Sequence, residues 1–233
     1  MTFIRSQARK RPPPDESTLL AWSFDGSQAP FSSDGSASPA MAIGAGGSNV
    51  FPSQAGSVSD AVLFRGDLGA AYLTGGSGSA NRPSSLTALT IDIWVYPVFN
   101  SGIQLIAYRQ YGATFVSPFS SAAMYLDAGV FRFGVTVSGT SDQPASINSN
   151  RVPEGQFSHI GMTYDGANVR QYINGSLTRT YARTGNVDYG TDGPWIVGAN
   201  SDSSSPFQGR INDLRVSTVV RPDDYFKSMF KSY

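Results

Sequence analysis

Two short segments in the second half of the chain alternate between apolar and polar side chains. Residues 157–164 alternate strictly, and residues 169–174 resume the alternation after a short gap. Asp165-Gly166 lies between them and suits a two-residue hairpin turn, because both residue types tolerate positive backbone angles. Asn174-Gly175 can reverse the chain a second time. The pattern therefore predicts consecutive antiparallel strands.

Other segments repeat this period of two. Residues 89–97 and 131–137 alternate in the same way, and weaker strand candidates lie at Asp60–Arg65, Gly102–Arg109 and Ala122–Leu126. We expect roughly ten to fourteen strands, which is enough for two packed antiparallel sheets with a shared core. The prediction is an all-β, two-sheet antiparallel sandwich.

A helical period occurs only at the C-terminal end. Pro222 can open a short helix over Pro222–Tyr233, in which Tyr225, Phe226 and Met229 would share a face with Phe230. The polar run at residues 26–59 has no regular period and predicts a long loop.

Composition agrees with a single sandwich domain. The 233 residues include 25 Gly and 14 Pro, which divide the chain into short segments, and 40% hydrophobic residues remain for a core. Cysteine is absent, and nowhere do eighteen apolar residues run together, so no membrane association is expected. The formal net charge is zero, which does not favour binding to nucleic acid.

The beginning of the chain differs from the rest. Its basic residues Arg5, Arg9, Lys10 and Arg11 precede Pro12-Pro13-Pro14. One interpretation is a solvated leader. The other is a basic arm, with the prolines as a stiff spacer, that docks on a neighbouring subunit or on nucleic acid. We favour an arm that packs in an assembly, because four cations are too few for strong binding to nucleic acid.

Several motifs resemble one protein family. They comprise His159, TYDG at 163–166 and YING at 172–175, together with LLAWSFDG at 19–26, LTIDIWVYP at 89–97, WIVGA at 195–199 and FQGRINDLRVS at 207–217. In this order they resemble the strands of laminin G-like, or concanavalin A-like, jelly-roll domains. The resemblance implies a jelly-roll sandwich over residues 18–220, preceded by an extended N-terminal arm at 1–17 and followed by a short C-terminal helix or tail at 221–233.

The end of the chain resembles a narrower group. Residues 209–226, GRINDLRVSTVVRPDDYF, are similar to the ending of laminin G-like domains in bacteriophage structural proteins. Two positions differ: Asn212 stands where that ending has Asp, and the tyrosine expected directly after Arg221 is found only at Tyr225. This resemblance implies a virion protein that is made in the host cytoplasm without a signal peptide. It would be a capsid decoration or cement subunit and a homo-oligomer, with the major capsid protein or neighbouring copies as partners.

The sequence offers few residues that could catalyse a reaction. A retaining glycosidase needs two carboxylates about 5 Å apart, but the only glutamates are Glu16 in the leader and Glu154 in a Pro-Glu-Gly turn. His159 is the only histidine, and it stands where the resembling family keeps a structural histidine. With no second histidine and no cysteine, a zinc site lacks ligands. We predict that the protein is not an enzyme.

Calcium stays open as an alternative. The resembling family often binds it at a sandwich rim, and Asp25, Asp34, Asp202 and Asp213 could contribute oxygen ligands. Aspartates followed by Gly or Ser are also ordinary turn residues, which is the interpretation we favour. We assign no metal and no cofactor.

A surface glycan is the alternative partner. A sugar site needs aromatic faces and polar side chains at one rim, and Tyr108, Tyr111 and Phe115 could supply them with Arg109 and Gln110. A second group would use Tyr189 near Tyr181, with Trp195 assigned to the core. These aromatic side chains could instead plug the sandwich ends or meet a neighbouring subunit. Two hypotheses remain: a structural virion protein, and a glycan-binding adhesion module of a phage tail fibre or cell surface.

Overall fold

Strands are the main regular structure in the part of the chain that the structure describes. The structure is a computed structural model, and it describes residues 12–24, 33–37, 40–44, 47–51, 61–75, 78–98, 101–141, 150–191 and 193–232. In these ranges there are fifteen strands, one α-helix, and two short 3₁₀ helices at Gly47–Asn49 and Ser79–Asn81. All strand pairs are antiparallel.

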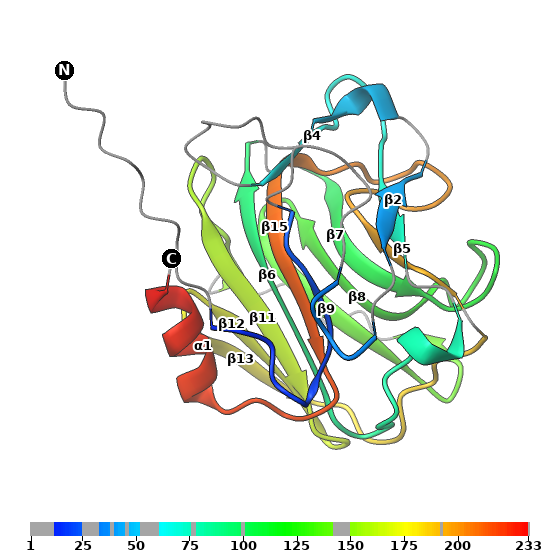
Figure 1. Ribbon diagram of the computed structural model, residues 1–233, viewed down its shortest axis with the longest axis vertical. Coiled ribbons are helices and arrows are strands. Elements are labelled where there is room, and N and C mark those ends of the chain that lie inside the picture. Colours follow the sequence, from blue (N-terminus) through cyan, green and yellow to red (C-terminus); the bar gives the residue numbers. More distant parts are fainter. Residues whose placement is uncertain are drawn as a thin grey trace.

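The strands form two sheets (Figure 1). The first sheet has eight strands, in the order β13 (Ser176–Ala182), β12 (Asn168–Ile173), β11 (Ser158–Tyr164), β6 (Leu89–Pro97), β15 (Gln208–Ser217), β4 (Val62–Arg65) and β3 (Val50–Phe51), with β1 (Thr18–Trp22) also paired to β15. The second sheet has seven, in the order β10 (Thr140–Ser141), β9 (Val130–Val137), β8 (Ser120–Asp127), β7 (Ile103–Gln110), β14 (Trp195–Val197), β5 (Leu73–Gly75) and β2 (Met41–Ile43).

The core lies between the sheets and is built from the alternating positions of their strands. The first sheet contributes Ile91, Ile93, Ile160 and Met162, and the second contributes Phe131, Phe133, Met124 and Val197, all fully or almost fully buried in one cluster. Burial of such side chains supplies about 1.5–3 kcal/mol each and is the main stabilising contribution. The predicted all-β, two-sheet antiparallel sandwich is therefore confirmed.

The two predicted hairpin turns have different outcomes. Asn174 and Gly175 have φ angles of 51° and 77° and connect Ile173 directly to its partner Ser176, as predicted. Asp165-Gly166 also lies in a tight turn, and Gly166 has the expected positive φ of 84°, but the backbone N–H of Asp165 donates to the carbonyl of Asn168 at 3.2 Å, so the central residues are Gly166 and Ala167 instead of Asp165 and Gly166. The Asp165 carboxylate accepts hydrogen bonds from the backbone N–H groups of residues 167 and 168, which stabilises the turn in this position.

The predicted C-terminal helix is α1 (Asp223–Lys231), which packs on the outer face of the first sheet over β11 and β13 (Figure 1). Phe226 is fully buried, and its ring stacks on Tyr172 of β12 at a centroid distance of 3.8 Å. Gly161 of β11 makes room for Phe226, since a Cβ atom there would lie 2.4 Å from the phenylalanine ring. Among the described helices, none is long and apolar enough to cross a membrane.

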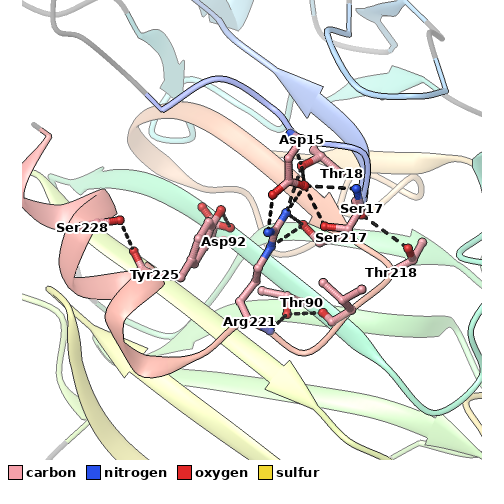
Figure 2. A network of polar contacts seen from close by, with 11 residues as sticks. Asp15, Ser17, Thr18, Thr90, Asp92, Ser217, Thr218, Arg221, Tyr225 and Ser228 are labelled. Atoms are coloured by element: carbon pink, nitrogen blue, oxygen red, sulfur yellow. Dashed lines mark hydrogen bonds and ion pairs between the residues drawn. The ribbon is translucent and has the colours of Figure 1, made fainter.

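A polar network fixes α1 and the start of β1 to the first sheet (Figure 2). The hydroxyl of Tyr225 donates to Asp92 Oδ2 at 2.9 Å, and His159 Nε2 lies 3.0 Å from Asp92 Oδ1. Arg221 reaches in the other direction, to Asp15 and Thr18. His159 and Asp92 are buried, so His159 occupies a structural position beneath the helix.

Candidate functional site

The candidate site is a pocket on the outer face of the second sheet, opposite the face that contacts the core. Its cavity volume is about 200 Å³. Strands β7, β8, β9 and β10 supply its floor, and two loops at residues 111–119 and 198–207 fold over it. This volume lies below the range of about 300–1,000 Å³ that is usual for drug-sized ligands. The pocket can therefore hold a small part of a longer ligand.

Aromatic side chains form one wall of the pocket. The rings of Tyr108 and Phe115 are 6.0 Å apart and inclined at 71°, and those of Phe115 and Phe119 are 4.9 Å apart and inclined at 42°. Tyr125 of β8 also lines the pocket. Phe119 is 45% exposed, so part of this wall faces solvent. Such a wall can bind the apolar face of a ring-shaped ligand.

Hydrogen bonds hold the two loops against β7. The backbone N–H of Ser201 donates to the Tyr108 hydroxyl at 3.0 Å, and the Ser201 hydroxyl donates to Gln110 Oε1 at 2.6 Å. Gln110 Nε2 then donates to the carbonyl of Gly112 at 2.8 Å. Burial raises the pKa of the Tyr108 phenol, which remains protonated at neutral pH. The pocket is thus preorganised from both sides.

The remaining lining is polar and uncharged. The Ser141 hydroxyl donates to the carbonyl of Pro118 at 2.8 Å and lies 3.2 Å from the Thr136 hydroxyl. Asn200 uses its amide nitrogen to donate to the Ser204 hydroxyl at 2.8 Å. Within the described residues, the Asn200 amide oxygen has no donor. These groups can accept hydrogen bonds from ligand hydroxyl groups.

Each of the two loops at the pocket contains at least one non-glycine residue with a positive φ angle. Phe119 and Ser205, which line it, have φ angles of 57° and 52°, and Ser203 in the same loop has 67°. Positive φ costs a non-glycine residue about 1–2 kcal/mol, and such residues cluster at binding sites. The two loops therefore hold conformations that the surrounding contacts must stabilise.

The structure brings together only some of the residues that the sequence predicted. Tyr108 and Phe115 lie in the pocket as floor and wall. Tyr111 lies outside it: its hydroxyl donates to Asp188 Oδ2 at 2.8 Å, and this hydrogen bond raises the pKa of Tyr111. The pocket therefore contains two of the four predicted aromatic contacts.

Two predicted contacts belong to the interior instead. Tyr189 is only 3% exposed, and the Arg109 guanidinium lies 5.5 Å from the centre of its ring. Arg109 is itself fully buried and donates to the carbonyls of Tyr189 and Thr191 at 2.8 and 3.1 Å. Burial raises the pKa of the Tyr189 phenol. The prediction that Tyr189 and Arg109 meet a ligand at the surface was wrong, because both side chains point into the sandwich. Trp195 is core, as expected.

Sequence reasoning missed Phe119, Tyr125 and Asn200. Tyr125 could have been found from the alternation along β8, where it shares the outward face with Ala123. Phe119 and Asn200 lie in loops without a periodic signal, and only the folded chain shows where they meet.

The predicted partner-binding arm is described only in part. Arg5, Arg9, Lys10 and Arg11 lie outside the described residues. Pro12, Pro13 and Pro14 line a crevice of about 250 Å³ on the first sheet, next to Trp22, Asp213 and Arg215. The proline segment is therefore held against the sandwich.

The described calcium candidates lie in two separate places. Asp25 lies outside the described residues, Asp34 and Asp213 line the crevice beside the prolines, and Asp202 caps its own loop by accepting from Ser204. Within the described ranges, no group of three or more His, Asp or Glu side chains is placed to hold a metal ion.

Comparison with known families identifies the fold. A family model described as the concanavalin A-like lectin/glucanases superfamily (Laminin_G_3) matches residues 67–224, which is more than half of the chain. The chain belongs to this superfamily. The resemblance to laminin G-like and concanavalin A-like jelly-roll domains is thereby confirmed. A search of curated protein sequences found no match.

Solved structures of this jelly-roll architecture include several binding domains. Domain 4 of AbnA, an extracellular arabinanase from Geobacillus stearothermophilus in complex with arabinotriose, is 16% identical, with a TM-score of 0.66 over 91% of this chain and 98% of that chain. The binding domain of botulinum neurotoxin serotype G is 14% identical, with a TM-score of 0.64 over 92% of this chain and 50% of that chain. A third structure concerns botulinum neurotoxin type C, whose cell entry depends on two ganglioside molecules; it is 13% identical, with a TM-score of 0.65, and the alignment covers 93% of this chain and 51% of that chain.

The chain therefore spans about half the length of the neurotoxin structures. At these identities, the similarity shows a shared fold. The similar structures are mainly binding domains.

Proposed function

We propose that this domain is a non-enzymatic carbohydrate-binding module whose ligand site is the pocket on the second sheet. The observation that carries the proposal is the aromatic wall of Tyr108, Phe115 and Phe119 beside the uncharged polar groups of Ser141 and Asn200. Sugars combine an apolar C–H face with a ring of hydroxyl groups, so they need both kinds of contact in one place. The similar fold of an arabinanase domain in complex with arabinotriose supports this assignment.

A binding role rather than hydrolysis agrees with the lining. No Asp or Glu side chain lines the pocket among the described residues, whereas glycoside hydrolysis uses two opposed carboxylates about 5–10 Å apart. Glu154 is exposed in a turn before β11, away from the pocket lining. The pocket can hold a sugar but offers no general acid within that lining.

Glycan-array screening followed by calorimetric titration tests the proposal. Phe115→Ala and Phe119→Ala should each weaken binding of the glycan found by about tenfold, because each removes a ring from the wall. Leu177→Ala is the control, since Leu177 is 46% exposed on β13 of the other sheet. Unchanged affinity in both phenylalanine variants would contradict the assignment of the pocket. Turnover of the bound glycan would contradict the non-enzymatic role.

A second candidate function rests on the proline segment. Pro12, Pro13 and Pro14 lie in the crevice beside Trp22, and Arg221 binds Asp15 directly after them. A proline segment with a fixed place on the sandwich is well suited to contribute to a contact with a neighbouring subunit, because fewer orientations are lost on binding. The corresponding proposal is a structural role in a virion, as a capsid decoration subunit and homo-oligomer.

Removal of residues 1–11 tests this second candidate. We expect the full chain to be oligomeric by light scattering and the shortened chain to be monomeric, with the same far-ultraviolet circular dichroism. The same oligomeric state in both chains would argue against an assembly role for the arm.

A further inference from the structure

The pocket on the second sheet is uncharged throughout its described lining. Apart from the aromatic wall, its lining consists of aliphatic, glycine, proline, hydroxyl and amide groups, and includes no Lys, Arg, Asp or Glu. Proteins that bind anionic ligands normally offer Arg or Lys side chains, or the N-terminus of a helix. The described lining contains neither, because it comes from strands and loops.

Several charged side chains lie next to the pocket without lining it. The Arg183 guanidinium donates a hydrogen bond to the carbonyl of Thr140, which precedes the lining residue Ser141. Arg132 of β9 lies opposite Tyr125 in the strand register, but its guanidinium already pairs with Asp127 at 2.5 Å. Asp202 lies in the loop that contributes Asn200 and Ser205 to the lining, and its carboxylate accepts hydrogen bonds only from Ser204 among the described residues. The loop therefore adds a negative charge without a paired cation.

The effect of Asp202 extends to the floor of the pocket. The pKa of Tyr108 is raised chiefly by burial, and the negative charge of Asp202 contributes in the same direction. A second anion placed over Tyr108 would meet the same unfavourable field. It would also lose part of its hydration shell against Phe115 and Phe119 without gaining a charged partner.

We infer that the pocket selects neutral sugars and excludes acidic ones such as uronates and sialylated glycans. This inference rests on the proposed carbohydrate-binding function. Hydroxyl groups of a neutral sugar can donate to the amide oxygen of Asn200 and to the hydroxyl oxygens of Ser141 and Thr136. A carboxylate cannot donate to any of them.

The test uses matched oligosaccharides. Trimers of glucose, galactose and mannose are compared on one array with the corresponding uronate trimers, which differ only by oxidation at C6. We expect the neutral member of the preferred pair to bind at least about tenfold more tightly, since one unfavourable charge interaction near a protein surface is of this size. Its affinity should also stay constant as the salt concentration is raised, because no ion pair is formed.

A charge introduced at the pocket gives an independent readout. Asn200→Lys should strengthen uronate binding by about tenfold, because it supplies the missing cation. Asn200→Gln keeps an uncharged amide and should leave uronate binding weak. Uronate binding at the pocket of the unmodified protein that equals or exceeds neutral binding would overturn the inference while leaving the proposed function intact. Asn200→Lys without effect on uronates would also overturn it. Failure of every sugar to bind would remove the proposed function and the inference together.

Discussion

Arg221 binds Asp15 through two parallel hydrogen bonds, from Nη1 to Oδ2 at 2.5 Å and from Nη2 to Oδ1 at 2.6 Å (Figure 2). The two residues are 206 positions apart, and the pair joins the segment before β1 to the segment between β15 and α1. Nη2 also donates to the hydroxyls of Thr18 and Ser217. Both ends of the described chain are thereby fixed at one place on the first sheet.

This pair should make stability depend on pH. The hydrogen bond from Arg221 holds the pKa of Asp15 well below its ordinary value of about 3.9. As pH falls, Asp15 is therefore protonated first in the unfolded chain. The contribution of the Asp15–Arg221 pair to the free energy of unfolding is complete above about pH 5 and is lost progressively as pH falls below about 4. Asp15→Asn should cost about 0.5–1 kcal/mol at pH 7, a value kept low because the Asp15 side chain is 56% exposed.

Urea unfolding at pH 7 and pH 3 measures this effect. The difference between the natural chain and Asp15→Asn should shrink at the lower pH. Asp67→Asn is the control, because Asp67 pairs with Arg65 only two residues away and joins no distant segments. A difference for Asp15→Asn that stays constant with pH would argue against a contribution from this carboxylate.

The carboxylate of Asp92 gives a second prediction. Tyr225→Phe removes the hydroxyl that donates to Asp92 Oδ2, and should cost about 2 kcal/mol because the carboxylate is only 1% exposed. Tyr172→Phe is the matched comparison: its hydroxyl donates to Asp223 at 2.8 Å, and Asp223 is exposed at the start of α1. We expect that loss to be about 0.5–1 kcal/mol. Equal losses in urea unfolding would show that the burial of Asp92 does not matter.

The packing of α1 depends on the glycine beneath it. Gly161→Ala would place a Cβ atom 2.4 Å from Phe226, whose ring is fixed by stacking on Tyr172. We expect a loss of about 1–3 kcal/mol, as for other overpacked sites. Gly112→Ala is the control, since the nearest atom to its added Cβ would lie at an ordinary 3.6 Å.

A double-mutant cycle locates the clash. Phe226→Leu provides space, so Gly161→Ala should cost less in that background than in the natural chain. Additive effects in thermal unfolding would show that the alanine clashes with another group.

Most of the fold could be predicted because each strand carries its own signal, the alternation of apolar and polar residues along a short segment. Alternation marked β6, β9 and β11 correctly, since one face of each strand packs in a shared core. Asp165-Gly166 marked the turn but placed its centre one residue too early, because Asp165 precedes the central residues and its carboxylate accepts hydrogen bonds from the backbone N–H groups of residues 167 and 168. Dipeptide preference alone cannot distinguish these two turns.

The candidate site was harder to predict because it depends on register and on distant loops. Between Leu105 and Ala107 the pairing of β7 with β8 shifts, so that Arg109 points into the sandwich whereas Tyr108 points outward. Such a shift leaves no simple period in the sequence. Phe115 and Asn200 meet at one pocket although 85 residues separate them, and this placement follows from the pairing of β14 with β7.

The Asn174-Gly175 turn gives a final prediction, because Asn174 has two separable roles. Its φ of 51° favours residues that tolerate the left-handed region, and its side-chain oxygen accepts from the backbone N–H of His159 at 2.9 Å. Asn174→Gly keeps the backbone angle but loses the hydrogen bond, and should cost about 1 kcal/mol. Asn174→Ala loses both and should cost about 2 kcal/mol. Urea unfolding of the two variants separates the roles. If Asn174→Ala lowers the free energy of unfolding no more than Asn174→Gly does, the positive backbone angle carries no cost at this turn.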